Sequence, residues 1–317
     1  GYDVIIADNL VNSSLEVLDG IEKITGIRPE FEEIDLTDGE VTRDFFARHS
    51  DIRAVIHFAA LKAVGESVSK PLEYYFNNLN SLMNVLTCMR EFKVPNLVFS
   101  SSCTVYGQAD VLPVTEKTPR HEAESPYGNT KVMSEDIIRD LMRVEPDMKA
   151  LALRYFNPIG AHPTAFIGEL PNGVPNNLIP YLTQTAIGIR EQLSVFGDDY
   201  NTPDGSPLRD YIDVVDLAQA HVVAIRRLLD GKNKKNYEFF NIGTGKALSV
   251  LEIIHAFERA TGVKVNYKVV GRRAGDIEKV WADTTLANNE LGWKAVTPIE
   301  ETLANAWKWQ KSLEATN

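Results

Sequence analysis

The fold is decided by residues 54–102, which read AVIHFAALKAVGESVSKPLEYYFNNLNSLMNVLTCMREFKVPNLVFSSS. Two short apolar runs, at residues 54–58 and 97–99, enclose a helical pattern over residues 72–92 that Pro71 introduces. Both runs are continuously apolar rather than alternating, as in strands that are buried on both faces of a sheet. A connection long enough to hold a helix joins parallel strands. This stretch therefore predicts a strand–helix–strand unit with parallel strands.

The same alternation continues on either side of this unit. Further apolar runs stand at residues 4–7 and 151–156, and further helical patterns at residues 14–25, 39–49 and 128–144, the last introduced by Pro126. Proline suits the first turn of a helix, where a backbone N–H has no partner to lose. Strands and helices in this order predict an α/β protein with a doubly wound parallel sheet of the Rossmann type.

The second half of the chain differs in composition and in its pattern of predicted elements. From about Asn157 it contains loops rich in proline, glycine and asparagine, short helical patterns and scattered strands, and it ends in a helical pattern over residues 299–313. We expect a nucleotide-binding domain over residues 1–156 and a smaller α/β substrate lobe over residues 157–317. Open α/β sheets bind ligands at the carboxyl ends of their strands, so the lobe is expected to cover that edge and form a cleft.

Composition narrows the class of protein. The 317 residues include 44% apolar and 24% charged side chains, which is typical of globular proteins. A net charge of -11 disfavours nucleic acid and anionic membranes as partners. The uncharged stretch 170–189 is broken by proline and glycine and is a poor membrane span. No two of the six histidines have metal-site spacing, so no metal is expected.

The expected compartment is the cytoplasm. The first residues lack the basic segment and the small-residue cleavage site of a signal peptide. Cys88 and Cys103 are the two cysteines, and they do not form a CxxC motif. That usage suits a reducing compartment.

An acidic residue ends the first predicted strand. Asp8 stands there, followed by Asn9. An acid at the end of the second strand of a Rossmann unit accepts the hydroxyls of the adenosine ribose and repels a 2′-phosphate, which favours NAD over NADP. The structural alternative is that this aspartate begins a turn or caps the next helix. Asn12 and Ser13 share that ambiguity.

The glycine-rich turn of a dinucleotide site does not stand before Asp8. In the usual strand order the first strand lies between the second and the fourth, so two inner strands would lack a partner without it. We therefore expect about twenty residues, forming a strand, a glycine turn and a helix, to precede Gly1 in the natural protein.

The strongest chemical pattern combines a serine-rich strand end with a tyrosine and a lysine. Ser100, Ser101 and Ser102 end the strand at 97–99, and Tyr127 precedes Lys131 by four residues at the start of a helix. That spacing places both side chains on one helix face. An ammonium beside a phenol stabilises the phenolate and lowers the pKa of the tyrosine toward that of a general base. The structural alternative is an ordinary surface pair.

These residues resemble the extended type of the short-chain dehydrogenase/reductase superfamily and, within it, the UDP-galactose (UDP-glucose) 4-epimerase family. The resemblance runs nearly from end to end. Its segments are VIIADNLVNSS, VIHFAALKAVGESVSKPLEYY, FSSSCTVYG, SPYGNTK, LRYFNPIGAHP, GVPNNLIPY, FGDDYNTPDGSPLRDYIDVVDLAQAH and GRRAGDIEKVWAD.

The resemblance implies an isomerase that keeps NAD bound throughout turnover. Tyr127 would remove the proton of the sugar 4-hydroxyl while hydride passes from C4 to the nicotinamide, and the 4-keto sugar would turn over and take the hydride back on its other face. Lys131 would bind the nicotinamide ribose and lower the pKa of Tyr127, together with the charge of NAD. Ser102 would hold the 4-oxygen.

The resemblance also implies two sets of binding residues. Those for NAD, besides Tyr127 and Lys131, are Asp8, Asn9, Asn12, Ser13, Asp35, Leu36, Phe58, Ala59, Ala60, Lys62, Asn77 and Phe156. Those for UDP-galactose or UDP-glucose, besides Ser102 and Tyr127, are Asn157, Asn177, Phe196, Arg209, Arg273, Asp276 and Val280. The two arginines would neutralise the pyrophosphate, whose geometry the guanidinium fork suits.

The residues at three positions help to distinguish this chain from related enzymes with other activities. Sugar-nucleotide 4,6-dehydratases carry an Asp-Glu pair just after the equivalent of Ser102, and here Cys103 and Thr104 stand there, so dehydration is disfavoured. Cys103 is then expected to be a small buried filler. Val280 stands where a tyrosine narrows the sugar pocket in the family, which suggests activity on UDP-GalNAc and UDP-GlcNAc as well. A uronate 4-epimerase and a non-catalytic nucleotide-sugar-binding module remain as alternatives.

Other conspicuous residues have structural interpretations. His57 is expected to be a satisfied core histidine, and Trp307 and Trp309 are expected to be packing or interface residues. The helical patterns at 72–92 and 128–144 correspond to those that pair into a four-helix interface in the superfamily, which implies a homodimer.

Overall fold

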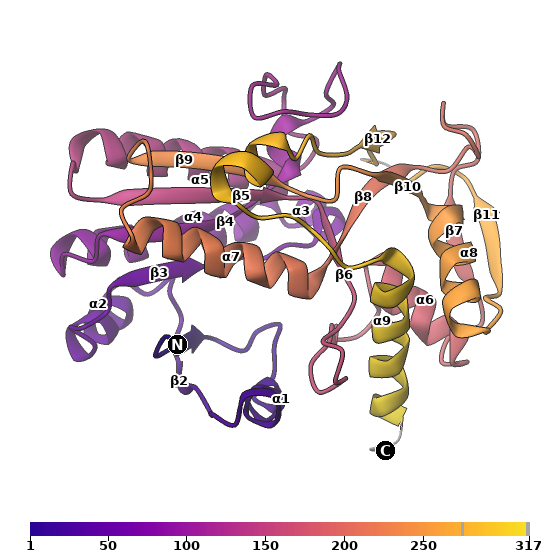
Figure 1. The fold of residues 1–317 in the computed structure, drawn as a ribbon, viewed down its shortest axis with the longest axis horizontal. Helices are drawn as coiled ribbons and strands as arrows, with labels where there is room; N and C mark the ends of the chain where they lie inside the picture. Colours follow the sequence, from indigo (N-terminus) through magenta and orange to yellow (C-terminus); the bar gives the residue numbers. More distant parts are fainter. Residues whose placement is uncertain (274–275, 315–317) are drawn as a thin grey trace.

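A four-stranded parallel sheet forms the centre of the larger part of the molecule (Figure 1). The computed structural model describes residues 1–273 and 276–314. The sheet has the order β3-β4-β5-β9, with strands β3 (Ala54–His57), β4 (Asn96–Ser102), β5 (Lys149–Tyr155) and β9 (Tyr237–Ile242). A second parallel pair joins β1 (Ile5–Asp8) to β2 (Glu30–Glu33). The predicted parallel pairing is confirmed.

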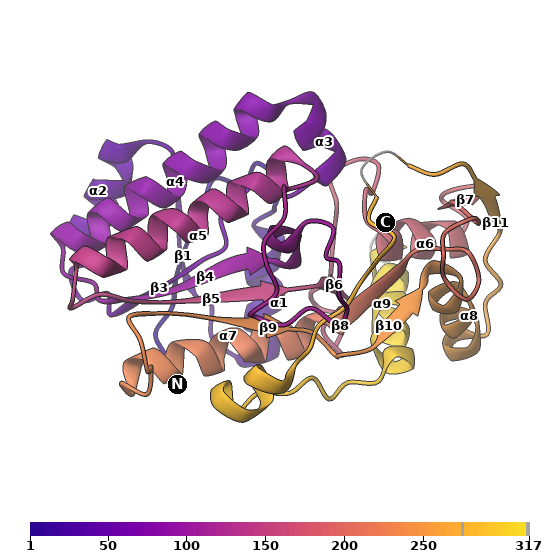
Figure 2. The same ribbon diagram turned by 90° about the horizontal axis from the view of Figure 1, so that it is seen from above.

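Helices cover both faces of the four-stranded sheet, as Figure 2 shows. One face carries α2 (Gly39–Arg48), α4 (Pro71–Glu91) and α5 (Pro126–Val144), and the other carries α7 (Val214–Leu229). Leu97 and Phe99 pack in the core beneath the first group. Val98, between them in sequence, packs in the core beneath α7. Because successive side chains point to opposite faces, a continuously apolar strand fills both cores, and the doubly wound prediction is confirmed.

Local signals set the helix starts. Pro71 and Pro126 occupy the first turns of α4 and α5, as predicted, and the Ser125 hydroxyl accepts a hydrogen bond from the Gly128 N–H at 3.1 Å. That bond satisfies one of the N–H groups that a helix start leaves free. The remaining short helices of this part are α1 (Glu16–Thr25), α3 (Val64–Ser69) and the 3₁₀ turn η1 (Cys103–Tyr106).

The second lobe is built on smaller sheets. Strand β8 (Leu208–Asp213) lies at its centre, between β10 (Ala247–Ser249) and β12 (Lys279–Val280), and also pairs with β6 (Asn157–Ile159). A parallel pair joins β7 (Leu193–Phe196) to β11 (Tyr267–Val270). Around them lie α6 (Leu178–Ala186), α8 (Val250–Thr261), the π-helical turn η2 (Ala287–Leu291) and α9 (Ile299–Glu314).

The two parts of the chain interleave in space. Helix α7 and strand β9 come after residue 157, yet α7 covers the main sheet and β9 extends it by pairing with β5. The division expected at residues 156 and 157 is therefore not a clean spatial boundary. Figure 1 shows the smaller lobe beside the carboxyl ends of β4 and β5, with β6 and β8 next to the main sheet.

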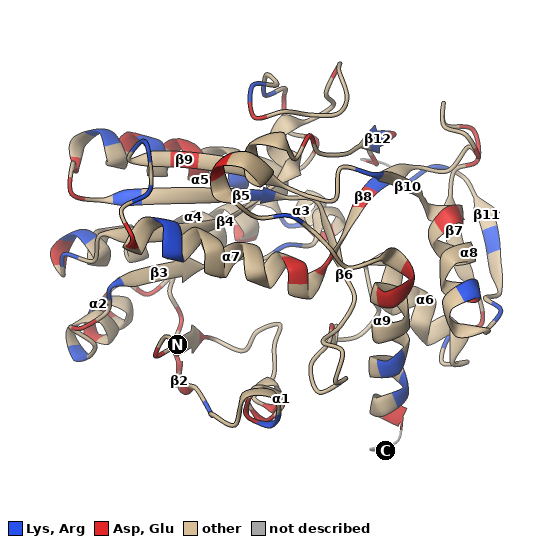
Figure 3. Cartoon of the chain, viewed as in Figure 1, with Lys and Arg blue, Asp and Glu red and all other residues tan. Residues whose placement is uncertain are grey.

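Basic and acidic residues are interspersed along the helices of both lobes (Figure 3). Arg43 of α2, for example, pairs with Glu91 of α4 at 2.5 Å. Within residues 1–273 and 276–314, no helix is both long enough and apolar enough to cross a membrane.

Candidate active site

Helix α5 brings a tyrosine and a lysine to the end of strand β4. Tyr127 and Lys131 are both buried, on one face of the helix as their spacing predicts. The Lys131 ammonium donates to the Ser100 carbonyl at 2.7 Å, and its Nζ lies 5.9 Å from the centre of the Tyr127 ring. Ser102 is the last residue of β4, its hydroxyl accepts from the Thr104 N–H at 3.2 Å, and its side chain is near enough to the Tyr127 phenol to lower the pKa of that tyrosine. The three predicted catalytic residues therefore meet at the carboxyl edge of the sheet.

Burial dominates the electrostatics of this group. It raises the pKa of Tyr127 well above its ordinary value, the neighbouring Tyr155 adds to that rise, and the hydrogen bond of Ser102 opposes it. Burial lowers the pKa of Lys131 to about 8, and the charge of Glu135 counters part of that fall. The expected lowering of the Tyr127 pKa by Lys131 is thus not found among the side chains of the chain itself, because Lys131 is directed at the Ser100 carbonyl.

A small pocket of about 50 Å³ lies beside β1 and β2. Eight residues predicted to bind NAD line it: Asp8, Asn9, Asn12, Asp35, Leu36, Ala59, Ala60 and Asn77. Carboxylates and amides can pair with ribose hydroxyls and with the edge of an adenine, and the alanines leave room for a flat ring. The side chains that line the pocket therefore have the hydrogen-bonding chemistry that the adenosine half of NAD requires.

Asp8 also performs the structural role that the sequence left open. Its Oδ1 accepts hydrogen bonds from the Leu10 N–H at 2.6 Å and from the Ser13 hydroxyl at 2.8 Å. Leu10 adopts a left-handed backbone conformation at φ 57°, which such a turn requires. One carboxylate oxygen thus holds the turn, and the residue still lines the pocket.

The other predicted cofactor residues lie outside the pocket lining. Phe58 is exposed, and its ring centre lies 4.6 Å from that of His221. Lys62 pairs with Glu169 at 3.7 Å. Phe156 is buried in a cluster with Val105 and Val280, next to the end of β5.

The structure divides the predicted substrate residues into three groups. Arg209 on β8 is the register partner of Val280 on β12. The guanidinium of Arg273 lies 5.3 Å from the centre of the Phe196 ring and pairs with Asp276 at 2.8 Å.

The third group lies nearer to the predicted cofactor residues. Asn177 precedes α6, and its amide donates to Glu169 at 2.6 Å, so that Glu169 contacts both Asn177 and Lys62. Asn157 begins β6, opposite Tyr211 of β8.

One residue that the sequence pattern did not single out supports the site. Asn78 is buried in α4, binds both the N–H and the carbonyl of Leu61, and donates to Thr130 of α5 at 3.0 Å. It thereby fixes the loop after β3 against the catalytic helix. The available signal was an amide on a helix face that is otherwise apolar. Ser100 contributes its carbonyl, which no side-chain motif reveals.

The structural interpretations agree with the packing. His57 is buried, with its ring stacked on Phe99 at 6.2 Å. Trp307 packs edge-on against Phe257, and Trp309 donates to the Glu169 carbonyl at 3.0 Å. Cys103 is partly buried against the cluster that contains Val280, and burial raises its pKa to about 12, so that the thiol stays protonated.

One cluster was not foreseen from residue spacing. The ring of His49 and the carboxylates of Glu30 and Glu32 approach within 4.8 Å of one another. Arg48 already pairs with Glu32 there, and His49 contacts the same carboxylate at 2.5 Å. These partners account for the cluster as a set of ion pairs at the edge of β2.

Comparisons with known proteins match this arrangement. A family model described as the NAD dependent epimerase/dehydratase family matches residues 1–243. A UDP-glucose 4-epimerase from Bacillus subtilis is 50% identical over 312 residues, which cover 98% of this chain and 91% of the relative.

Solved structures give the same result. A UDP-glucose 4-epimerase from Bifidobacterium longum, crystallised with NAD+ and UDP, has a TM-score of 0.94 at 46% identity and covers 98% of this chain and 92% of its own. Another from Stenotrophomonas maltophila, with bound NAD and formylated UDP-arabinopyranose, has a TM-score of 0.95 at 45% identity, with coverage of 100% and 93%.

Proposed function

Because the chain belongs to the NAD dependent epimerase/dehydratase family, we propose that it interconverts UDP-glucose and UDP-galactose with NAD as its resident cofactor. The observation that carries the proposal is the meeting of Tyr127 and Lys131 on α5 with Ser102 at the end of β4. A protein that only binds a nucleotide sugar, without catalysis, does not require a phenol and an ammonium buried together at the binding site.

The residues of the chain divide the reaction between them. Tyr127 takes the proton of the sugar 4-hydroxyl and returns it to the product, and Ser102 donates to the 4-oxygen. Bound beside Tyr127 and Lys131, NAD would supply reversible hydride transfer at the sugar C4, and its positive charge would favour the phenolate of Tyr127. Lys131 stays protonated beside them and binds the nicotinamide ribose. No net oxidation occurs, because the hydride and the proton both return to the sugar.

We assign the two ligands to the two segments of the chain. Residues 1–156 hold NAD, through the pocket beside β1 and β2. Residues 157–317 hold most of the UDP-sugar, with Phe196 at the uracil, Asp276 at the uridine ribose, Arg209 and Arg273 at the pyrophosphate, and Asn157 and Asn177 at the sugar or diphosphate. Arginine supplies the local positive charge that a chain of net charge -11 needs in order to bind a pyrophosphate.

The decisive experiment measures epimerisation directly. Purified protein is incubated with UDP-galactose, and UDP-glucose is quantified by ion-pair chromatography, with Tyr127→Phe as the inactive variant. We expect turnover in the wild type and a fall of about 10²–10⁴-fold in kcat in the variant, the range of general-base catalysis. Turnover of UDP-glucuronate in place of the hexoses would favour the uronate epimerase. Binding of UDP without turnover of either would favour the non-catalytic module.

We also propose that the chain forms a homodimer through α4 and α5. The two helices lie side by side on one face of the sheet (Figure 2). They expose the large apolar side chains Leu72, Phe76, Met83 and Met133, an arrangement typical of an interface. Light scattering after size exclusion tests this proposal. A mass near twice 35.4 kDa is expected for the wild type, and a mass near 35.4 kDa for Phe76→Glu.

The proposed compartment is the cytoplasm. Its support is the pair of free cysteines, Cys88 and Cys103, neither of which forms a disulfide. Fractionation of the source cells with an antibody to the protein tests it, and recovery from an oxidising compartment would contradict it.

A further inference from the structure

A buried ion pair lies one helical turn beyond the catalytic lysine. We propose that Glu135, held by Arg154, is a positioning residue that fixes the orientation of α5 and thereby places Lys131 and Tyr127 against strand β4. The inference rests on the proposed function, since it concerns how the same site is built.

Glu135 has its carboxylate fully satisfied in the interior. It is 0% exposed, and it accepts hydrogen bonds from Arg154 Nε at 2.8 Å and Arg154 Nη2 at 2.6 Å. The Ser101 hydroxyl donates to it at 2.6 Å, and Arg120 adds a further ion pair. A buried carboxylate with four donors around it permits little movement of the helix that carries it.

Three consecutive serines of β4 contact three successive turns of α5. Ser102 lies near Tyr127 and lowers its pKa, the Ser100 carbonyl accepts from the Lys131 ammonium, and the Ser101 hydroxyl donates to Glu135. Tyr127, Lys131 and Glu135 are spaced by four residues each and so share a helix face. The third contact differs from the other two because Glu135 also forms an ion pair with Arg154, which lies on β5 of the main sheet.

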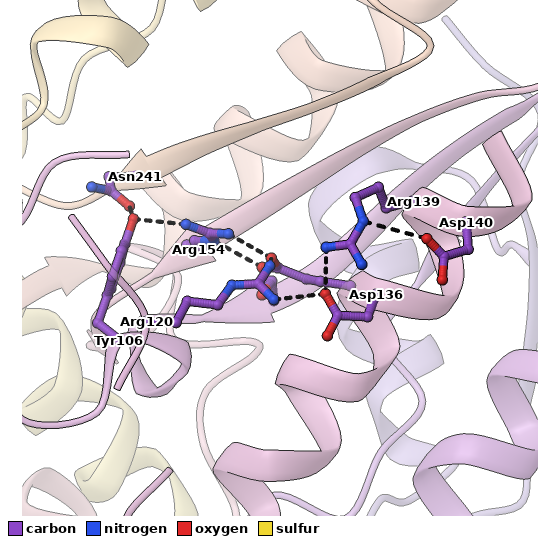
Figure 4. Close-up of polar contacts among 9 residues, drawn as sticks. Tyr106, Arg120, Asp136, Arg139, Asp140, Arg154 and Asn241 are labelled. Carbon is purple, nitrogen blue, oxygen red and sulfur yellow. Dashed lines mark hydrogen bonds and ion pairs between the residues drawn. The ribbon is translucent and has the colours of Figure 1, made fainter. Parts of the chain in front are cut away.

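The network extends from Arg154 through Tyr106 to Asn241 on β9 (Figure 4). Arg154 Nη1 donates to the Tyr106 hydroxyl at 3.0 Å, and that hydroxyl donates to Asn241 at 2.6 Å. The Asn241 amide in turn donates to the Val114 carbonyl at 3.0 Å.

Val114 connects this network to the strand next to the substrate residues. Its N–H donates to the Trp281 carbonyl at 3.0 Å, directly after Val280. The orientation of α5 is thus tied to the segment that holds the register partner of Arg209.

Charge gives Glu135 a second effect on the site. The charged and titratable groups around Lys131 are Tyr127 and Glu135 on α5 and His57 on β3, with the Ser100 carbonyl on β4. Glu135 is the anion of this set, and its charge raises the pKa of Lys131 against the effect of burial. Burial alone would raise the pKa of Glu135, but Arg154, Arg120 and Ser101 hold it below its ordinary value, so the carboxylate is ionised.

The test removes the pair as a unit. Glu135→Gln alone leaves the Arg154 guanidinium buried and unpaired, which is strongly destabilising, whereas apolar replacement of both partners is often tolerated. The variant is therefore Glu135→Leu with Arg154→Met. The matched control is Arg227→Met with Glu238→Leu, a largely buried pair at 2.8 Å between α7 and β9, on the opposite face of the sheet.

We expect the test variant to keep its circular dichroism spectrum and to lose about tenfold or more in kcat, with KM changed by less than about threefold. The control pair is expected to keep the kcat of the wild type. Equal kcat in the wild type and in the test variant would overturn the proposal.

A second readout does not depend on turnover. The ¹³Cε resonance of Lys131, assigned through Lys131→Arg, is titrated in the holoenzyme. The midpoint is expected to be lower in the test variant than in the wild type and unchanged in Glu135→Asp, which keeps the charge. An unchanged midpoint in the test variant, or a lowered one in Glu135→Asp, would overturn the electrostatic role. Because the titration needs no substrate, it separates failure of this inference from failure of the proposed function.

Discussion

The Lys131 ammonium lies 2.7 Å from the Ser100 carbonyl, two residues before the serine that contacts Tyr127. One strand therefore positions both members of the tyrosine–lysine pair. Lys131 binds the backbone carbonyl of Ser100, so a change of the Ser100 side chain does not remove this contact.

Activity should depend on the protonation of Lys131. Burial lowers the pKa of this lysine to about 8, so the ammonium is present below that pH and is lost above it. We expect kcat/KM to fall by about tenfold per pH unit above the midpoint, since the neutral amine no longer supplies positive charge to the site. The measurement is a pH profile of kcat/KM from pH 6 to 10.

Lys131→Arg is the control for this profile. Its guanidinium stays protonated over the whole range, so the decline that begins near pH 8 should disappear even if kcat is lower. The same decline in the wild type and in Lys131→Arg would assign it to another group.

Val280 should control the choice of sugar. It is buried beside Phe156 and partly buried Cys103, in one apolar cluster. A tyrosine at this position would fill space that a 2-acetamido group requires. We expect Val280→Tyr to lower turnover of UDP-GalNAc at least tenfold relative to UDP-galactose, whereas Val280→Ile should change the ratio little. Equal ratios in Val280→Tyr and the wild type would refute the role of this residue.

Two buried histidines should weaken the fold in mild acid. Burial lowers the pKa of His57 to about 3 and that of His221 to about 4. Below the ordinary value of about 6.5, the unfolded chain takes up protons at these positions while the folded chain does not, so stability falls as pH falls. Each histidine contributes about 1.4 kcal/mol per pH unit between pH 6 and 5.

Urea unfolding at pH 6 and at pH 5 measures this loss. His57→Phe with His221→Phe should show a smaller fall in the free energy of unfolding between the two pH values than the wild type does. Equal falls in both proteins would show that other groups cause the acid sensitivity.

Helix α8 should lose stability when its N-terminal cap is removed. The Ser249 hydroxyl accepts from the Glu252 N–H at 3.0 Å, and Glu252 accepts from the Ser249 N–H at 2.7 Å. We expect Ser249→Ala to lower the free energy of unfolding by about 1–2 kcal/mol, and Ser249→Thr to lower it less, because threonine keeps the hydroxyl. Urea midpoints of the two variants measure the difference, and coincident midpoints would contradict it.

The main sheet could be predicted because its strands are apolar on both faces. The observed bounds of β3, Ala54–His57, differ from the predicted run by one residue. β4 is longer than the predicted run at 97–99, because the serines continue the pairing with β5 up to Ser102 and Tyr155. β2 was missed because its sequence EFEE is mostly charged, and its partly exposed place in a two-stranded sheet needs little apolar surface.

The proximity of Tyr127 and Lys131 could be predicted because helical spacing alone places them on one face of α5. Glu135 could not be placed in the same way, since a glutamate on a helix is usually solvated and its partner Arg154 lies on another element. An arginine inside an apolar strand run was the available signal. The pairing of Arg209 with Val280 depends on a register between distant segments, which local patterns do not contain.

The pairing of β5 with β9 has a consequence for biosynthesis. Ala150 is the register partner of Tyr237, 87 positions later in the chain. At synthesis rates of about 5–20 residues per second, the edge of β5 waits roughly 4–17 s for its partner to leave the ribosome. During that interval an apolar strand of the central sheet has one open edge, a surface that invites chaperones or a second nascent chain. The partly synthesised chain is therefore most prone to associate with other chains before the segment that ends in β9 has left the ribosome.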